Sequence, residues 1–293
     1  MSRIHEFLER PDLDSPVLVV ALEGWIDAGG AAARAAAALL DGVESTPVVR
    51  FDADLLLDHR SRRPVMSIRN GMNTGLTWPT IEMVAFSDPG GNDVLALTGA
   101  EPDHQWKAFA TAVADLALEL GVRLVVGLGA YPAPVPHTRP SLLASTATDE
   151  TLAAQVGTIR SNVDVPAGIG GAIEAQCAAV GLPAVGLWAQ VPHYASAMPY
   201  PKASLALIEK LNELGGYTFP TGTLAEDAAT VTSRLDELVA DSTEHVELLH
   251  QLEAQADDLG GDEPDDPAAP RDLPTGDELA GEIERFLRDQ GGR

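Results

Sequence analysis

Short apolar runs alternate with longer segments of helical period along most of the chain. The runs are rich in β-branched residues and predict buried strands at residues 16–22, 93–99, 122–130 and 183–191. Between them, residues 103–120 place one apolar face on a helix, formed by Trp106, Phe109, Val113, Leu116 and Leu120. Further helices are expected after Gly30, over 170–180 and from Lys202. This alternation predicts a three-layer α/β/α sandwich with a mostly parallel sheet.

Three shorter runs predict additional strands near Val48, Val65 and Ile81. The last two are separated by GMNTGLTWP, residues 71–79, which is rich in turn-forming residues. We therefore expect the strands near Val65 and Ile81 to form a hairpin.

The composition changes at Thr223, where a charged amphipathic region begins. Its apolar positions predict two helices or one bent helix, and they are followed by the acidic, proline-rich stretch GGDEPDDPAAPRDLPTG. We therefore divide the chain into an α/β/α domain (1–222), a helical appendage (223–260), an acidic flexible linker (261–275) and a C-terminal helix (276–293).

The chain is strongly acidic, which limits its partners. It has 19 basic and 44 acidic side chains and a formal charge of −25 over 293 residues. Such a charge repels nucleic acid and anionic membranes, so neither is expected as a partner. The N-terminal residues lack an apolar signal core, no apolar run is long enough to span a membrane, and Cys177 is the single cysteine. These features predict a soluble cytoplasmic protein.

Candidate chemistry gathers where the predicted strands end. The loop GAYPAPVPHTRP, residues 129–140, holds four prolines, from which we expect a rigid loop and no interior strand. VPHT and VPHY each follow a strand, and EGWIDAGG follows the first one, so the three segments are expected at one edge of the sheet. The candidate ligand-binding residues are Gly24, Trp25, Asp27, Gly29, Gly30, His137, Arg139, Gly170, Gly171, His193 and Tyr194.

Each candidate also has a purely structural interpretation. Asp27 is a plausible N-cap, the glycines allow a helix to pack closely on a strand, and a histidine beside proline often bonds a neighbouring loop. Neither GxGxxG nor the phosphate-binding loop GxxxxGK[ST] occurs at the first strand. His245 and His250 are five residues apart and predict no zinc site, and Cys177 is expected in the core. We expect no cofactor and no metal.

Four segments together resemble the PAC2 family, named for proteasome assembly chaperone 2, and its actinobacterial branch in particular. They are EGWIDAGGAA, GLGAYPAPVPHTRP, GIGGA and AQVPHYASAMPYPKAS, and the resemblance covers about Pro16 to Leu214. It implies a fold like that of purine nucleoside phosphorylases with a helical appendage, small oligomers, and a chaperone-like role towards proteasome subunits. The ending DQGGR departs from the hydrophobic-tyrosine tail by which related factors dock on the proteasome, so contact through such a tail is not expected.

Two functions remain open at this point. The first is a non-enzymatic assembly or scaffolding protein that binds proteasome subunits. The alternative is an enzyme, phosphorylase- or hydrolase-like, or a sensor that binds a nucleoside-like or phosphorylated small molecule, with Arg139 and His137 at the phosphate and the leaving group. In either case the apolar positions of the C-terminal helices favour a homo-oligomer, a dimer or trimer.

Overall fold

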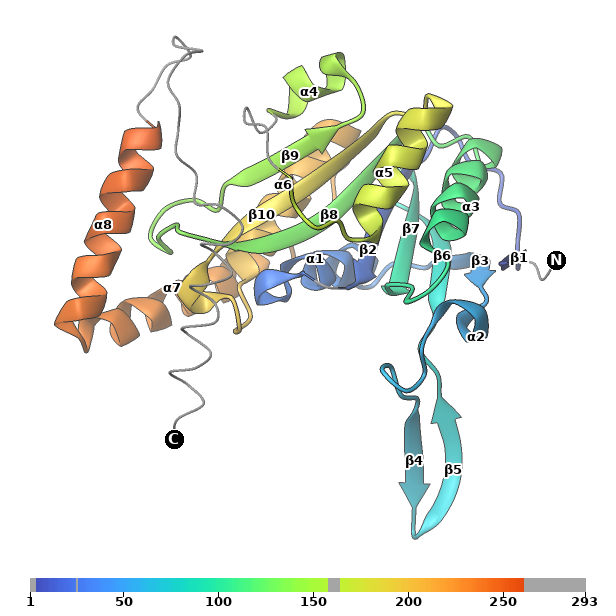
Figure 1. The fold of residues 1–293 in the computed structure, drawn as a ribbon, viewed down its shortest axis with the longest axis horizontal. Coiled ribbons are helices and arrows are strands. Elements are labelled where there is room, and N and C mark those ends of the chain that lie inside the picture. Colours follow the sequence, from blue (N-terminus) through green and yellow to red (C-terminus); the bar gives the residue numbers. More distant parts are fainter. Residues whose placement is uncertain (1–3, 25, 158–163, 261–293) are drawn as a thin grey trace.

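A single large sheet organises the chain (Figure 1). The computed structural model describes residues 4–24, 26–157 and 164–260, and within them eight strands form this sheet in the order β1-β3-β6-β7-β2-β8-β10-β9. The strands are β1 (His5–Phe7), β2 (Val17–Glu23), β3 (Thr46–Phe51), β6 (Ile81–Ser87), β7 (Asp93–Ala100), β8 (Leu124–Ala133), β9 (Leu143–Ala147) and β10 (Ala184–Pro192).

The sheet has a parallel centre and antiparallel flanks. Strands β7, β2, β8 and β10 pair in parallel, whereas β6, β3 and β1 follow on one side, and β9 on the other, through antiparallel pairs. The central strands are the apolar runs from which a parallel sheet was predicted, because strands covered on both faces have few polar positions.

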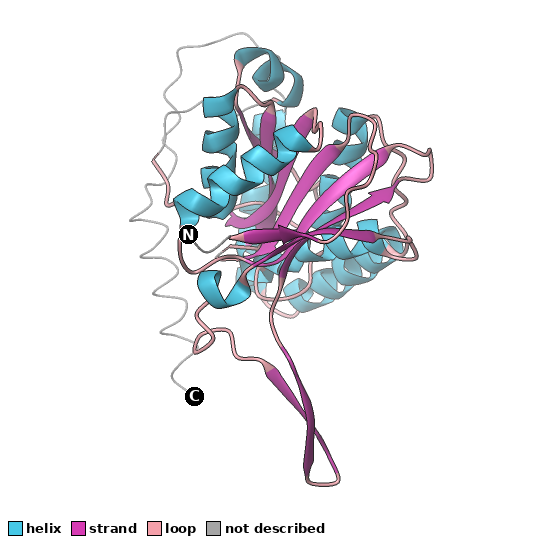
Figure 2. Cartoon of the chain, turned by 90° about the vertical axis from the view of Figure 1, so that its right-hand side faces the viewer, coloured by secondary structure: helices cyan, strands magenta, loops and turns pink. Residues whose placement is uncertain are grey.

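Helices cover both faces of the sheet and enclose two cores, which confirms the three-layer α/β/α sandwich (Figure 2). One face packs against α1 (Ala31–Leu40) and α6 (Pro201–Gly215), the other against α3 (Trp106–Glu119) and α5 (Ile169–Val180). The predicted helical face of α3 is buried at Phe109, Val113 and Leu116. Two short helices, α2 (Ala53–Leu56) and α4 (Glu150–Val156), complete the domain.

The predicted hairpin between the strands near Val65 and Ile81 is wrong. The hairpin instead joins β4 (Val65–Arg69) to β5 (Met72–Thr77), and β6 pairs with β3 and β7 in the main sheet. The turn is Asn70-Gly71, with φ of +51° and +80°, a left-handed pair that suits a two-residue hairpin. The supposed connecting loop is therefore mostly the second strand of an arm that projects from the body (Figure 1).

The expectation that GAYPAPVPHTRP contains no interior strand is also wrong for its first residues. Strand β8 runs through Pro132, and its pairing with β10 continues to Ala133 opposite Pro192. On its other side, β2 accompanies β8 only as far as Gly127. A proline is tolerated beyond that point because the missing N–H faces no neighbouring strand.

Within the described residues, two helices follow the sheet domain: α7 (Leu224–Ala240) and α8 (Thr243–Gly260). Helix α7 packs on α6, and α8 stands at the end of the molecule beside the loop after β8 (Figure 1). The predicted linker at 261–275 and helix at 276–293 lie outside the described residues. No helix in the described part of the chain has the length and apolar character needed to cross a membrane.

Candidate functional site

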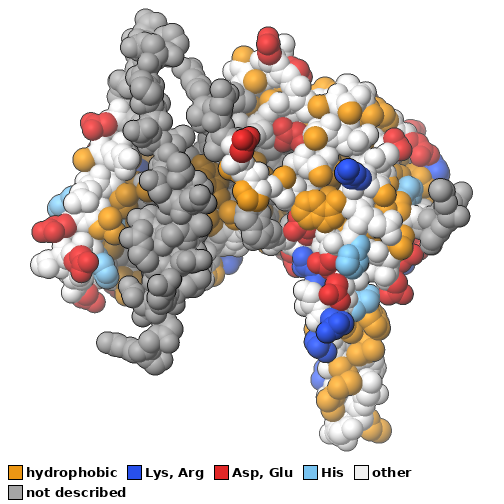
Figure 3. Space-filling view, viewed as in Figure 1, with side chains coloured by type: hydrophobic (Ala, Val, Ile, Leu, Met, Phe, Trp, Pro, Cys, Tyr) orange, Lys and Arg blue, Asp and Glu red, His pale blue; other side chains and the backbone are white. Residues whose placement is uncertain are grey.

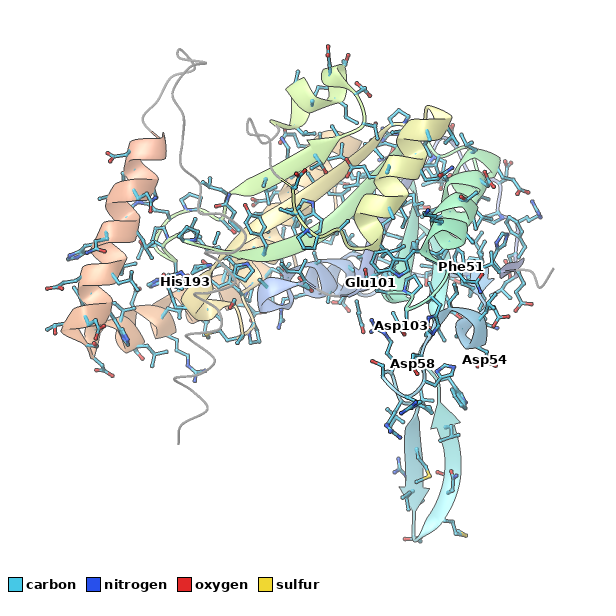
Figure 4. The ribbon with its side chains drawn as sticks, in the orientation of Figure 1. Phe51, Asp54, Asp58, Glu101, Asp103 and His193 are labelled. Carbon is cyan, nitrogen blue, oxygen red and sulfur yellow. The ribbon has the colours of Figure 1, made fainter. Side chains whose placement is uncertain are left out.

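The predicted site residues divide into two groups along the edge where the central strands end. Figure 4 shows this separation, with Glu101 beside the start of α5 and His193 towards the C-terminal helices. One group, formed by the Asp27 turn and the loops after β8 and β10, packs on the α1 and α6 face. The other, containing Gly24, Gly170 and Gly171, lies on the α5 face. Trp25 lies outside the described residues.

The turn after β2 is a structural cap. Both Asp27 carboxylate oxygens accept backbone N–H groups of α1, from Ala32 at 2.8 Å and Ala33 at 3.0 Å. Gly29 has φ of +64°, and a Cβ there would lie 2.6 Å from the Cβ of Tyr200. The first amides of α1 are thus occupied by Asp27, whose negative charge also opposes an anion.

His137 is fully buried between the loop after β10 and helix α7. Its Nδ1 lies 2.7 Å from the Tyr194 hydroxyl, its Nε2 lies 3.1 Å from Asp236 Oδ1, and its backbone N–H donates to the Tyr194 oxygen at 2.9 Å. Burial, together with the nearby carboxylates of Glu253 and Asp236, raises the pKa of Tyr194 to about 12, so the hydroxyl keeps its proton. The Tyr194 hydroxyl oxygen accepts a hydrogen bond from the His137 backbone N–H, and its one proton is free to be donated. We therefore assign His137 Nδ1 as the acceptor of the Tyr194 O–H, and His137 Nε2–H as the donor to Asp236.

Arg139 connects the same loop to helix α8. Its Nε and Nη2 donate to the two carboxylate oxygens of Asp257 at 2.7 and 2.8 Å, and Nη1 donates to Glu253 at 3.2 Å. Thr138 donates to the same Glu253 oxygen at 2.6 Å. A phosphate bound by Arg139 would have to displace these carboxylates. His193 is exposed and stacks edge-on with Tyr194, their ring centroids 5.3 Å apart.

A cavity lies at the second group, between the strand ends and the start of α5. Its walls include the three predicted glycines together with residues that the sequence reasoning missed, namely Gly127, Gly129, Gly186, Glu101, Glu174 and Trp188. Glu101 is buried, and its Oε1 accepts the backbone N–H of Ile169 at 2.7 Å, which fixes the first turn of α5 to the end of β7. The missed signal was the glycines at alternate positions of β8, because alternate residues of a strand share one face.

Within the described part of the chain, neither group forms a metal centre. Among the residues that the structure describes, no three His, Cys, Asp or Glu side chains are placed to hold a metal ion. Cys177 lies on the buried face of α5, and burial, reinforced by the charge of Glu174, raises the pKa of its thiol to about 11. A thiol held protonated in this way is a poor nucleophile.

Comparison with known proteins gives one family. The model of the PAC2 family matches residues 21–239. Among solved structures, a Corynebacterium glutamicum protein of unknown function is 31% identical, with a TM-score of 0.82 over 88% of this chain and 98% of that one. A PAC2 family protein of Streptomyces avermitilis is 37% identical (TM-score 0.73, 80% and 99% covered). A proteasome-assembly chaperone homologue of Mycobacterium tuberculosis is 34% identical (TM-score 0.74, 80% and 99% covered). No curated protein matches the chain.

Proposed function

Because the chain belongs to the PAC2 family, we propose that it is a non-catalytic protein-binding factor that assists the assembly of proteasome subunits. The observation that carries this proposal is the similarity to the mycobacterial proteasome-assembly chaperone homologue along nearly the whole of that protein. His137 and Arg139 were the candidates for a catalytic role, but both form hydrogen bonds to carboxylates of α7 and α8, which supports a structural role for them. A proteasome partner and a single, buried cysteine favour the cytoplasm.

These contacts support the proposed division of the chain into two parts. Residues 1–222 act as the α/β/α domain and residues 223–260 as a helical appendage, which the loop after β8 ties to the domain through His137, Thr138 and Arg139. Among the described residues, the appendage thereby covers the edge of the sheet near His193 and leaves the α5 side and the β4–β5 arm for contacts with other molecules.

The arm is the surface on which we expect self-association. Its apolar side chains are 46% to 68% exposed: Val65, Met66, Ile68, Met72, Leu76 and Trp78. In the described structure β4 and β5 pair only with each other, and an isolated two-stranded hairpin is marginally stable in water. A contiguous apolar surface on such an arm indicates a protein partner that covers it (Figure 3).

Charge supports a second copy of this chain as that partner. Residues 59–81 contain four arginines (Arg60, Arg62, Arg63 and Arg69) and no acidic residue, whereas the whole chain has a formal charge of −25. The arm is therefore a basic, apolar extension of an acidic body, and the body of another copy complements it in charge. We thus propose a homo-oligomer, a dimer or trimer, built through the arm.

The oligomer is tested by Ile68→Asp in the full chain. This substitution places a charge on the exposed face of the arm and should shift native mass spectra and sedimentation profiles from the oligomer to the monomer. Leu118→Asp on α3 is the matched control, since Leu118 is exposed to a similar degree and lies away from the arm. Unchanged assembly of the Ile68→Asp protein would exclude the arm as the interface.

The proteasome role is tested with purified subunits. The full chain is mixed with α-type or β-type proteasome subunits of its own host and followed by native mass spectrometry as the particle forms. We expect complexes of defined stoichiometry that disappear when complete particles accumulate. If chain and subunits migrate independently at micromolar concentration and particles form at the same rate without the chain, the proposed function is refuted.

A further inference from the structure

The cavity beneath the start of α5 has no place in the proposed function. It has a volume of about 60 Å³. A single water needs roughly 10–15 Å³, so this cavity is large enough for several waters or for a small organic group. Protein interiors are otherwise closely packed, and a space of this size at the strand ends of an α/β sheet is where ligands commonly bind.

The floor of the cavity is made by glycines inside strands. Gly127 and Gly129 of β8 and Gly186 of β10 face α5, on the same side of the sheet as Val125 and Ala184. Glycine weakens a strand interior, and it often marks a place where a ligand approaches the backbone. Packing does not require it at position 127, because a Cβ there would meet its nearest neighbour, the Val185 carbonyl oxygen, at 3.7 Å.

Three polar groups converge above Gly186. The position that its Cβ would occupy lies 2.6 Å from the Thr146 hydroxyl oxygen, 3.0 Å from Glu174 Oε2 and 3.0 Å from the indole nitrogen of Trp188. The Trp188 ring lies against Gly129, where a Cβ would come within 2.5 Å of it. The same small space thus presents a carboxylate and an aromatic ring beside the bare backbone of the sheet.

The charge in the cavity has one sign. Of the described residues that line it, Glu101 and Glu174 carry charge and none is Lys, Arg or His. Glu174 accepts a hydrogen bond from Thr146 at 2.7 Å and forms no salt bridge within the described residues. Its environment is partly desolvated, since burial raises the pKa of its carboxyl. A carboxylate in such a place gains from a cation and repels an anion.

We propose that this cavity binds an organic cation: an ammonium or guanidinium group on a short apolar stem. Glu174 is the counter-ion, and Trp188 offers its ring to the cation and the stem. Apolar lining residues such as Leu22 and Ile173 accommodate the stem. The cation can belong to a free small amine or to a lysine or arginine side chain of a partner protein, because both present the same chemistry.

The test uses calorimetric titration of the full chain with defined probes. The probes are n-butylammonium and a terminally blocked Gly-Lys-Gly peptide, and n-butanol and butyrate serve as neutral and anionic controls of similar shape. We expect n-butylammonium to bind and both controls to fail. Binding of the peptide as well indicates that a protein side chain can enter, whereas binding of the free amine alone assigns the site to small amines. Equal binding of butanol, or no binding of either cationic probe, overturns the proposal.

Two variants assign any binding to the cavity. Glu174→Gln keeps the shape but removes the charge and should weaken n-butylammonium binding by about tenfold or more, with Glu237→Gln on the exposed face of α7 as the matched control. Gly127→Ala places a methyl group in the cavity without a clash, so it should reduce binding while leaving the folded protein at least as resistant to heat. Unchanged affinity in both variants would show that the cation binds elsewhere.

Discussion

The Tyr194 hydroxyl holds the buried part of the loop after β8, and Tyr194→Phe removes that one oxygen. In the wild-type protein this oxygen accepts the His137 backbone N–H at 2.9 Å and lies 2.7 Å from the ring Nδ1. His137 is fully buried, so the variant leaves an amide and a ring nitrogen without partners and out of reach of water. A buried polar group that loses its partner destabilises a protein by about 1–3 kcal/mol, and we expect a loss of about 2–4 kcal/mol for the two together.

The assay combines urea unfolding with hydrogen exchange. Urea unfolding gives the loss in free energy of unfolding, and exchange at the His137 amide reports on the loop directly, because the amide donates to the hydroxyl that is removed. Tyr200→Phe is the control: Tyr200 is more deeply buried than Tyr194, but its hydroxyl forms no hydrogen bond within the described residues. If Tyr194→Phe has the same free energy of unfolding as the wild type and the His137 amide stays protected from exchange, the assigned hydrogen-bond network is refuted.

Two further substitutions probe other polar contacts. Asp88→Asn should lower the free energy of unfolding by about 1–3 kcal/mol at neutral pH. Burial alone would raise the pKa of Asp88, but the hydrogen bonds that its carboxylate accepts from Asn92 and Thr218 outweigh burial and lower the pKa. Since a carboxyl with a lowered pKa stabilises the fold above its unfolded pKa of about 3.9 and loses that contribution in acid, the gap between variant and wild type in urea titrations should narrow below about pH 4. Arg139→Gln removes the paired bonds to Asp257 and should speed hydrogen exchange in α8 while exchange in the central strands stays unchanged.

The sheet and its covering helices could be predicted because a strand that is buried on both faces is apolar along its whole length, and such a run is visible in the sequence. Runs such as 16–22 and 93–99 have almost no polar residues, and each proved to be a central strand. The hairpin was misplaced because its two strands are exposed on both faces, so apolar and polar residues do not alternate along them as they do in a half-buried strand. Asn70-Gly71 was the available signal, since this dipeptide favours the two-residue turn that the structure contains.

The site was harder to predict because its residues depend on which face of the sheet each segment reaches. Topology placed the segments after β2, β8 and β10 at one edge, and they do lie there. It did not show that α7 and α8 would supply Asp236 and Asp257, whose carboxylates accept hydrogen bonds from His137 and Arg139. Contacts between segments about 100 residues apart have no counterpart in local sequence pattern.

The alternating residues of β8 favour the α5 face of the sheet as the place of a ligand-binding site. Residues 124, 126 and 130 point to the α1 and α6 core, where every position carries a side chain, whereas 127 and 129 point to α5 and are both glycine. Gly127 leaves open space under the helix, and Gly129 makes room for the Trp188 ring that borders this space. That space therefore exists because of the sequence of the strand itself, and Glu174 and Trp188, which line it from α5 and β10, set the charge and shape of what it can hold.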